Sequence, residues 1–167
     1  MGKSGAPGQF RRAAIKGRVE QMFLGKYQHF LDNKGRLTIP ARFRQILLEK
    51  GAYVTQGFDH NLMVLPATAF EAISQRIQQM SITDPMARLL RRLIFSSGEQ
   101  VEVDKAGRIL IPQYLREAVD LDGEAILIGS GEYFEIWSPE AWREQDRQIK
   151  DSEANSQRFA IFDLISG

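Results

Sequence analysis

The sequence predicts a mainly β protein with flanking α-helices, in which two tandem β-β-α-β-β repeats interlock into one barrel of the swapped-hairpin or double-psi-like kind. Three observations predict this fold class: an internal repeat, apolar–polar alternation around glycine turns, and amphipathic helical patterns outside the repeats. The chain has 167 residues, of which 43% are hydrophobic. That length favours one domain, and two small units bury enough apolar surface only if they share a core.

The internal repeat begins at the motif Asp-x-x-Gly-Arg-x-x-Ile-Pro, which occurs at Asp32–Pro40 and again at Asp104–Pro112. The two copies lie 72 residues apart, and a gapless alignment of the 39 positions that start there contains 9 identities. Ordinary composition gives about two or three identities by chance. We therefore expect two copies of one unit, repeat 1 over residues 26–69 and repeat 2 over residues 98–141.

Each copy is expected to open with a β-hairpin. In the second copy, Val101 and Val103 alternate with polar residues before the turn, and Ile109 and Ile111 do so after it. A period of two is typical of half-buried strands. In such a turn an aspartate accepts backbone hydrogen bonds and a glycine takes the left-handed conformation. The turn-forming residues are therefore predicted to be Asp32, Gly35, Asp104 and Gly107.

A short helix is expected after each of these hairpins. Pro40 and Pro112 end the second strand because proline lacks the N–H that a strand ladder requires, and proline suits the first turn of a helix. The helices are predicted over about residues 41–49 and 113–120, up to the next glycine in each copy.

A second hairpin completes each copy. The apolar stretches that predict its strands lie at residues 53–56 and 62–65 in repeat 1, and at residues 125–128 and 134–137 in repeat 2. The order of elements in the unit is therefore β-β-α-β-β.

Helical patterns occupy the segments between and after the repeats. Residues 70–97 are predicted to form a helical linker, because apolar residues recur at helical spacing over 66–80 and 85–95. Residues 142–167 are expected to form a C-terminal helix and tail, with the helix over 139–149. These stripes carry more apolar surface than one small core uses, which predicts self-association.

Charge divides the chain into two parts. Residues 1–21 contain five basic residues and one acidic residue, so residues 22–167 have a net charge of −3 although the whole chain has +1. We expect residues 1–21 to be a disordered extension, because they mix small and basic residues with little periodicity. A DNA-binding surface on the rest of the chain has to gather its positive charge locally.

Composition also argues against several classes of protein. There is no cysteine, which excludes disulfides and thiolate metal sites and fits a reducing cytoplasm. No apolar run is long enough to span a membrane, and the first residues lack the apolar stretch of a signal peptide. The two histidines show no metal-ligand spacing. We expect no enzyme activity, cofactor, metal, small-molecule substrate or membrane partner.

Basic residues gather around both Asp-x-x-Gly-Arg turns. Arg36 and Arg108 lie on the strand face opposite Leu37 and Ile109, so the geometry of a hairpin turn does not account for them. In a β-ribbon that binds DNA, arginine reaches guanine O6 and N7 and lysine meets phosphate. The predicted DNA-binding residues are Asn33, Lys34, Arg36, Arg42, Lys105 and Arg108. A solvated charged surface is the alternative interpretation.

The motifs also resemble a known family. The stretch from Met22 to Arg44, the second Asp-x-x-Gly-Arg-Ile-x-Ile-Pro copy, and Phe-Glu-Ile-Trp at 134–137 are similar to the bacterial MraZ proteins, over about residues 22–145. The resemblance implies tandem SpoVT/AbrB-type domains and ring-shaped oligomers. It implies DNA contacts at Asp32, Lys34, Gly35, Arg36, Asp104, Gly107 and Arg108. In the second copy Ala106 stands where the first copy has a lysine.

Taken with the basic turns, the resemblance predicts a transcriptional regulator that binds double-stranded DNA at repeated short promoter boxes as a homo-oligomer. By the resemblance, its target is the division and cell-wall gene cluster, and its place is the cytoplasm, at the nucleoid. Each hairpin is expected to bind one box weakly, and the oligomer to gain affinity by engaging several boxes. The alternative function is an oligomeric protein-interaction scaffold without specific DNA binding.

Overall fold

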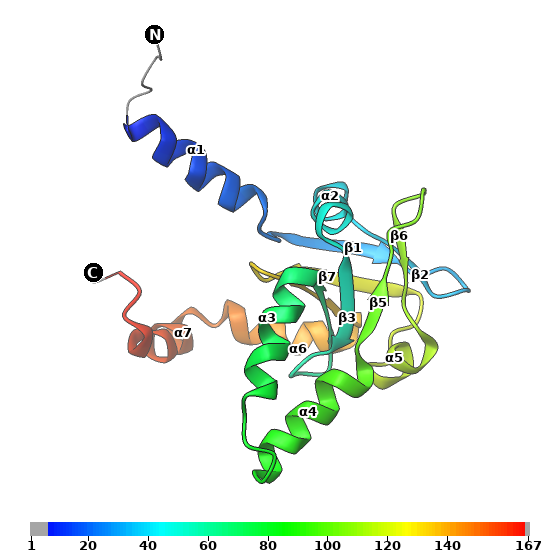
Figure 1. Cartoon of the computed structure of the whole chain (residues 1–167). Helices are drawn as coiled ribbons and strands as arrows, with labels where there is room; N and C mark the ends of the chain where they lie inside the picture. Colours follow the sequence, from blue (N-terminus) through cyan, green and yellow to red (C-terminus); the bar gives the residue numbers. More distant parts are fainter. Residues whose placement is uncertain (1–6, 166–167) are drawn as a thin grey trace.

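The computed structural model describes residues 7–165 (Figure 1). Repeat 1 folds as β1 (Lys26–Phe30), β2 (Arg36–Thr38), α2 (Ala41–Lys50), β3 (Ala52–Gln56) and β4 (Leu62–Pro66). Repeat 2 folds as β5 (Glu99–Val101), β6 (Arg108–Leu110), α5 (Gln113–Ala118), β7 (Glu124–Gly129) and β8 (Phe134–Trp137). The remaining elements are α1 (Pro7–Glu20), α3 (Ala67–Gln78), α4 (Pro85–Ser97), α6 (Pro139–Lys150), α7 (Ser152–Phe159) and the 3₁₀ helix η1 (Ala160–Phe162).

The strands form antiparallel sheets. Six of them make one sheet in the order β1-β7-β8-β4-β3-β5, and β2 pairs with β6 in a separate two-stranded ribbon. Strand β1 pairs with β7 of the other repeat, and β5 pairs with β3 of the other repeat. The prediction of a mainly β protein with flanking helices is confirmed.

The prediction of a closed barrel is wrong for the described residues. Strands β1 and β5 are the two edges of the six-stranded sheet, and no ladder joins them. The chain leaves this sheet at each Asp-x-x-Gly-Arg turn. The strands that follow the turns, β2 and β6, form their ladder hydrogen bonds with each other. The sheet therefore stays open, with the β2–β6 ribbon as a separate layer.

The first predicted hairpin of each copy is also wrong, whereas the second is confirmed. The strands on either side of the first turn do not form a ladder with each other, and repeat 1 keeps only the single bridge between Leu31 and Leu37. Strands β3 and β4 pair, as do β7 and β8. The alternation of apolar residues fixes which face of a strand is buried, and it does not identify the partner strand.

One hydrophobic core joins the two repeats. Phe23 and Phe43 from the first half contact Phe134 from the second, with ring centroids 5.0–5.2 Å apart, and all three side chains are buried. The core-facing residues of the ribbon, Leu37 and Ile109, are also inaccessible to solvent. Neither repeat has a core of its own, so the two repeats form one folding unit.

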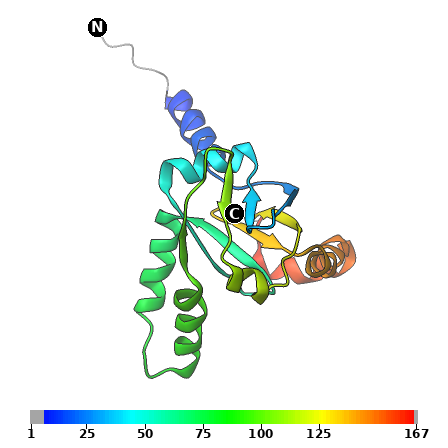
Figure 2. The ribbon, with the colours of Figure 1, turned by 90° about the vertical axis from the view of Figure 1, so that its right-hand side faces the viewer.

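The predicted helices flank this core. Helices α3 and α4 lie side by side against one part of the sheet (Figure 2), where Ile77 and Ile94 form a second apolar cluster with Met63 and Leu65 of β4. Asp84 is the N-cap of α4, and its side chain accepts a hydrogen bond from the Met86 amide at 2.9 Å. None of the helices between residues 7 and 165 is long and apolar enough to cross a membrane.

The prediction of a disordered extension over residues 1–21 differs from the structure, in which Pro7–Glu20 forms α1. Residues 1–6 of that prediction lie outside the described residues. Alanine and arginine, which are frequent in α1, have high helix propensity, so a helix forms without the apolar stripe that sequence analysis looks for. Helix α1 points away from the sheet (Figure 1).

Candidate nucleic-acid interface

The turn of repeat 1 is closed by its aspartate. Asp32 Oδ1 accepts hydrogen bonds from the backbone amides of Lys34 at 3.0 Å and Arg36 at 2.9 Å. The Gly35 amide donates to the Asp32 carbonyl at 3.1 Å, and Gly35 has a φ of +83°. Glycine adopts this left-handed conformation without steric cost. Asn33 and Lys34 are therefore held at an exposed tip.

The turn of repeat 2 repeats this geometry. Asp104 Oδ1 accepts from the amides of Ala106 and Arg108, both at 2.9 Å, and Gly107 has a φ of +78°. Lys105 is exposed at the tip. The two turns thus present the same backbone shape, with Lys34 at one tip and Lys105 at the other.

Each turn aspartate also binds the arginine that follows the turn. Asp32 Oδ2 lies 2.6 Å from Arg36 Nε, and Asp104 Oδ2 lies 3.1 Å from Arg108 Nε. The expectation that the turn leaves the arginines unexplained is therefore wrong, because the turn aspartate orients both. An arginine held at Nε keeps its terminal Nη groups for bidentate binding. Within residues 7–165, the structure shows no hydrogen bond or ion pair to the Nη groups of Arg36.

The ribbon brings the two arginines together. Arg36 pairs with Leu110 and Thr38 with Arg108 in the β2–β6 register, so the two arginines are diagonal neighbours on the face opposite Leu37. Arg108 Nη1 lies 3.6 Å from Asp32 Oδ2, which links the turns. The side chains of Arg36 and Arg108 are 34% and 29% exposed. The turns themselves project at opposite ends of the ribbon (Figure 1).

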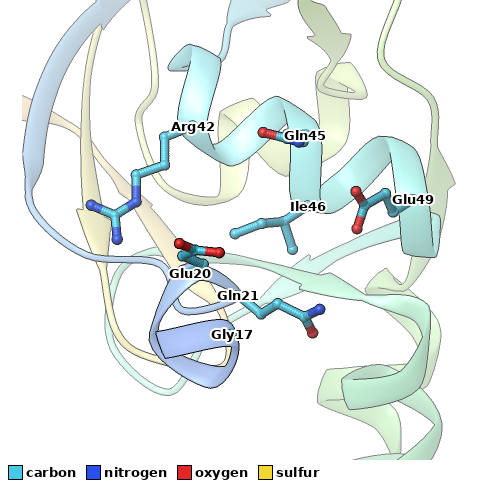
Figure 3. Close-up of a pocket in the computed structure, with 7 residues that line it drawn as sticks. All are labelled: Gly17, Glu20, Gln21, Arg42, Gln45, Ile46 and Glu49. Carbon is cyan, nitrogen blue, oxygen red and sulfur yellow. The ribbon is translucent and has the colours of Figure 1, made fainter. Parts of the chain in front are cut away.

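Arg42 lies apart from the other predicted residues. It is on α2, and with Glu20 and Gln21 it lines a cavity between α2 and the end of α1 (Figure 3). Its side chain extends toward the end of α1, on the side of Glu20. The structure therefore groups Asn33, Lys34, Arg36, Lys105 and Arg108 on the ribbon and its turns, and it places Arg42 on α2 beside the end of α1.

Arg44 and Arg116 also lie at the turns, although neither is among the predicted DNA-binding residues. Both are half-buried, and each lies next to the turn glycine of the other repeat. Their identity in the internal alignment was the available signal, since only 9 positions of 39 are identical. The alignment does not show which strands pair, so it could not place these arginines beside the turn of the other repeat.

The turn aspartates have lowered pKa values. Backbone hydrogen bonds from Arg36 and Lys34, together with the Arg36 guanidinium, hold the pKa of Asp32 below its ordinary value of 3.8. The Arg108 amide and guanidinium lower the pKa of Asp104 in the same way. Both carboxylates are therefore ionised at neutral pH and keep the turns closed.

These lowered pKa values predict an acid-sensitive stability. The folded state binds these protons less readily than the unfolded state, so the stabilisation is complete above the unfolded-state pKa and is lost as the pH falls through the folded-state pKa. The double variant Asp32→Asn/Asp104→Asn is expected to lose less stability than wild type between about pH 5 and pH 2. Urea unfolding at several pH values measures this, with Asp122→Asn as a control outside the turns. Parallel pH profiles of wild type and the double variant would contradict the prediction.

The turn glycines give a prediction on stability. Gly35→Ala is expected to cost about 1–2 kcal/mol for the left-handed conformation. Its Cβ would lie 2.7 Å from Arg116 Cζ, so the arginine side chain would also have to move. Gly123→Ala is the matched control, since Gly123 has a φ of +74° and open space around it. Thermal and urea unfolding of both variants measure the difference. Equal losses would show that Arg116 gives way without cost.

Within residues 7–165, no group of three histidine, aspartate or glutamate side chains is placed to hold a metal ion. His60 Nε2 lies 2.8 Å from Asp120 Oδ2, and both side chains are largely exposed. The arrangement with a defined chemistry is the β2–β6 ribbon, whose arginine forks and lysines suit phosphate and base edges.

Comparisons with known proteins agree with the resemblance noted in the sequence. A family model described as "MraZ protein, putative antitoxin-like" matches residues 22–93 and again residues 94–162. A protein of Roseiflexus castenholzii named transcriptional regulator MraZ is 42% identical over 139 residues, which cover 83% of this chain and 94% of the relative. Relatives of the same name in Thermomicrobium roseum and Dictyoglomus thermophilum are 44% and 46% identical, covering 74% and 76% of this chain and 87% and 86% of theirs.

Proposed function

Because the chain belongs to the MraZ family, we propose that it is a transcriptional regulator that binds repeated short promoter boxes in double-stranded DNA as a homo-oligomer. The names of its relatives support transcriptional regulation. The target we propose is the division and cell-wall gene cluster, and the proposed place of action is the nucleoid in the cytoplasm. The proposed domain organisation is a SpoVT/AbrB-type repeat at 26–69, a helical linker at 70–97, a second repeat at 98–141 and a C-terminal helix and tail at 142–167.

The observation that carries the proposal is the pair of aspartate-oriented arginines on the outer face of the ribbon. Asp32 holds Arg36 at Nε, so the two Nη groups keep the fork geometry that matches O6 and N7 of guanine. Lys34 and Lys105 are exposed at the tips, and the proposal assigns them to phosphate contacts on either side. A two-stranded antiparallel ribbon fits the major groove.

The electrostatics of the chain favour weak binding by one ribbon. Asp32 and Asp104 offset part of the positive charge of the arginines, and the net charge of residues 22–167 is −3. Affinity for DNA therefore requires several ribbons that act together, as in an oligomer on repeated boxes. Exposed apolar side chains on α4 support self-association, since Met86 is 71% and Leu89 57% exposed.

A binding titration with the DNA upstream of the protein's own gene tests the proposal. We expect wild type to bind this DNA in preference to scrambled DNA, and duplexes with several boxes far more tightly than a duplex with one. Light scattering on the same samples is expected to show an oligomer well above the 19.0 kDa of one chain. An oligomer with equal affinity for all duplexes would favour the alternative, an interaction scaffold whose ion-paired arginines are only solvated.

A further inference from the structure

The guanidinium of Arg116 lies directly against the turn of the other repeat. A Cβ built on Gly35 would lie 2.7 Å from both Cζ and Nε of Arg116. Reciprocally, a Cβ on Gly107 would lie 2.5 Å from Nη1 and 2.6 Å from Cζ of Arg44. With each arginine in this position, a Cβ at the glycine would overlap it, so in each case one repeat's arginine closely contacts the other repeat's turn.

Backbone hydrogen bonds anchor each arginine at this place. Arg116 Nε donates to the Ile111 carbonyl at 3.0 Å, and the Ile111 amide donates to the Gly35 carbonyl at 2.9 Å. Ile111 therefore holds both the arginine of its own repeat and the turn of the other. The same residue joins the side chain and the turn, so the position of the guanidinium is fixed relative to Gly35.

The turn of the second repeat has the matching connection, made by residues of the first. Arg44 Nε donates to the Ile39 carbonyl at 2.7 Å, and the Ile39 amide donates to the Gly107 carbonyl at 2.9 Å. Within residues 7–165 the structure pairs neither Arg44 nor Arg116 with a carboxylate. Neither guanidinium is held by an ion pair, so packing against the glycine and the single backbone bond account for its position.

We propose that Arg116 and Arg44 are positioning residues that act across the repeats, Arg116 on the DNA-binding turn at Asp32–Arg36 and Arg44 on the turn at Asp104–Arg108. The role in DNA binding rests on the proposed function, whereas the ordering of the turns does not. Repeat 2, which has Ala106 where repeat 1 has Lys34, then contributes to binding through Arg116 as well as through its own turn.

Hydrogen exchange without DNA tests the ordering directly. In Arg116→Ala, the amides of Gly35 and Arg36 are expected to exchange about tenfold faster, with the turn of repeat 2 unchanged. In Arg44→Ala, the turn at 104–108 is expected to loosen and the turn at 32–36 to stay unchanged. Loosening of the turn in the same repeat, equal loosening of both turns, or no change in either turn would overturn the proposal.

Two control variants separate position from charge. Arg116→Lys keeps the positive charge and lacks the planar guanidinium, so we expect it to loosen the turn at 32–36 as Arg116→Ala does. Recovery of slow exchange in Arg116→Lys would overturn a positional role for the guanidinium. Arg143→Ala removes the same charge from an exposed site on α6 and is expected to leave both turns unchanged. Circular dichroism confirms that each variant is folded.

Double-mutant cycles on DNA affinity test the consequence for binding. If Arg116 acts by positioning the turn of repeat 1, its effect is non-additive with Lys34→Ala and additive with Lys105→Ala. Arg44→Ala is expected to show the opposite pattern. Additivity of Arg116→Ala with both lysine variants, together with a lower salt slope, would show a direct phosphate contact and overturn the positioning role. If wild type binds no DNA, the proposed function fails, and hydrogen exchange still decides the ordering.

Discussion

Arg36→Ala is expected to erase the preference for the specific promoter boxes while the protein stays folded. A bidentate arginine–guanine contact discriminates by about 1–3 kcal/mol against the wrong base. That contribution disappears at every ribbon of the oligomer that engages a box, so even the lower value summed over several ribbons removes detectable specific binding. The measurement is a titration on the upstream DNA and on scrambled DNA, at two salt concentrations.

Three further variants separate the roles of the neighbouring side chains. Arg36→Lys keeps the charge and loses the fork, so it is expected to lose specificity almost as fully as Arg36→Ala. Lys34→Ala is expected to weaken binding to all sequences alike and to lower the salt slope by about 0.9 for each phosphate that the lysine no longer neutralises. Arg108→Ala is expected to cost less than Arg36→Ala, because Arg108 Nη1 already lies 3.6 Å from Asp32.

The turn aspartate complicates any substitution of Arg36, because Asp32 loses an ion pair at 2.6 Å. Asp32 Oδ1 still binds the two backbone amides, which keep the turn closed, and circular dichroism and the hydrogen exchange of Gly35 check this. A folded Arg36→Ala that keeps full box preference would exclude the ribbon as the DNA-reading element. The interaction scaffold would then be the better account of this chain.

The local structure was predictable at positions where the backbone conformation strongly favours one residue type. Gly35 and Gly107 occupy left-handed turn positions, and Pro40 and Pro112 precede α2 and α5, as turn and helix chemistry dictate. These constraints act within a few residues, so the sequence contains them in full. The strands, the helices of the linker and the exposed turn tips were also predictable from local patterns of a few residues.

Long-range pairing was not predictable from the same patterns. Val101 and Ile109 both show the alternation of a buried strand, yet β5 pairs with β3 and β6 pairs with β2. Alternation fixes a face and leaves the partner open, so the local hairpin and the closed barrel were both inferred in error. The contact of Arg116 with Gly35 depends on that partner choice, and sequence spacing therefore gave no sign of it.

Phe43→Ala is expected to destabilise the whole protein by about 3–5 kcal/mol. Phe43 is fully buried, and its ring centroid lies 5.0 Å from those of Phe23 and Phe134 and 5.2 Å from that of Tyr27. Truncation removes the free energy gained by burying the ring, and it leaves a cavity between three rings that the sheet holds in place. Leu48→Ala is the matched control on α2, since Leu48 is 65% exposed and a change within about 0.5 kcal/mol is expected there.

The shared core is tested by the shape of the unfolding curve as well as by the loss of stability. Phe43 belongs to repeat 1 and Phe134 to repeat 2, and strands β1 and β5 each pair with a strand of the other repeat. Neither repeat can therefore unfold alone, and Phe43→Ala is expected to shift one cooperative transition without splitting it, by circular dichroism and tryptophan fluorescence alike. The indole of Trp137 is a suitable probe because it is buried on β8 in repeat 2. A first transition that left this fluorescence unchanged would contradict the prediction. It would mean that repeat 2 keeps its structure when the core of repeat 1 is weakened.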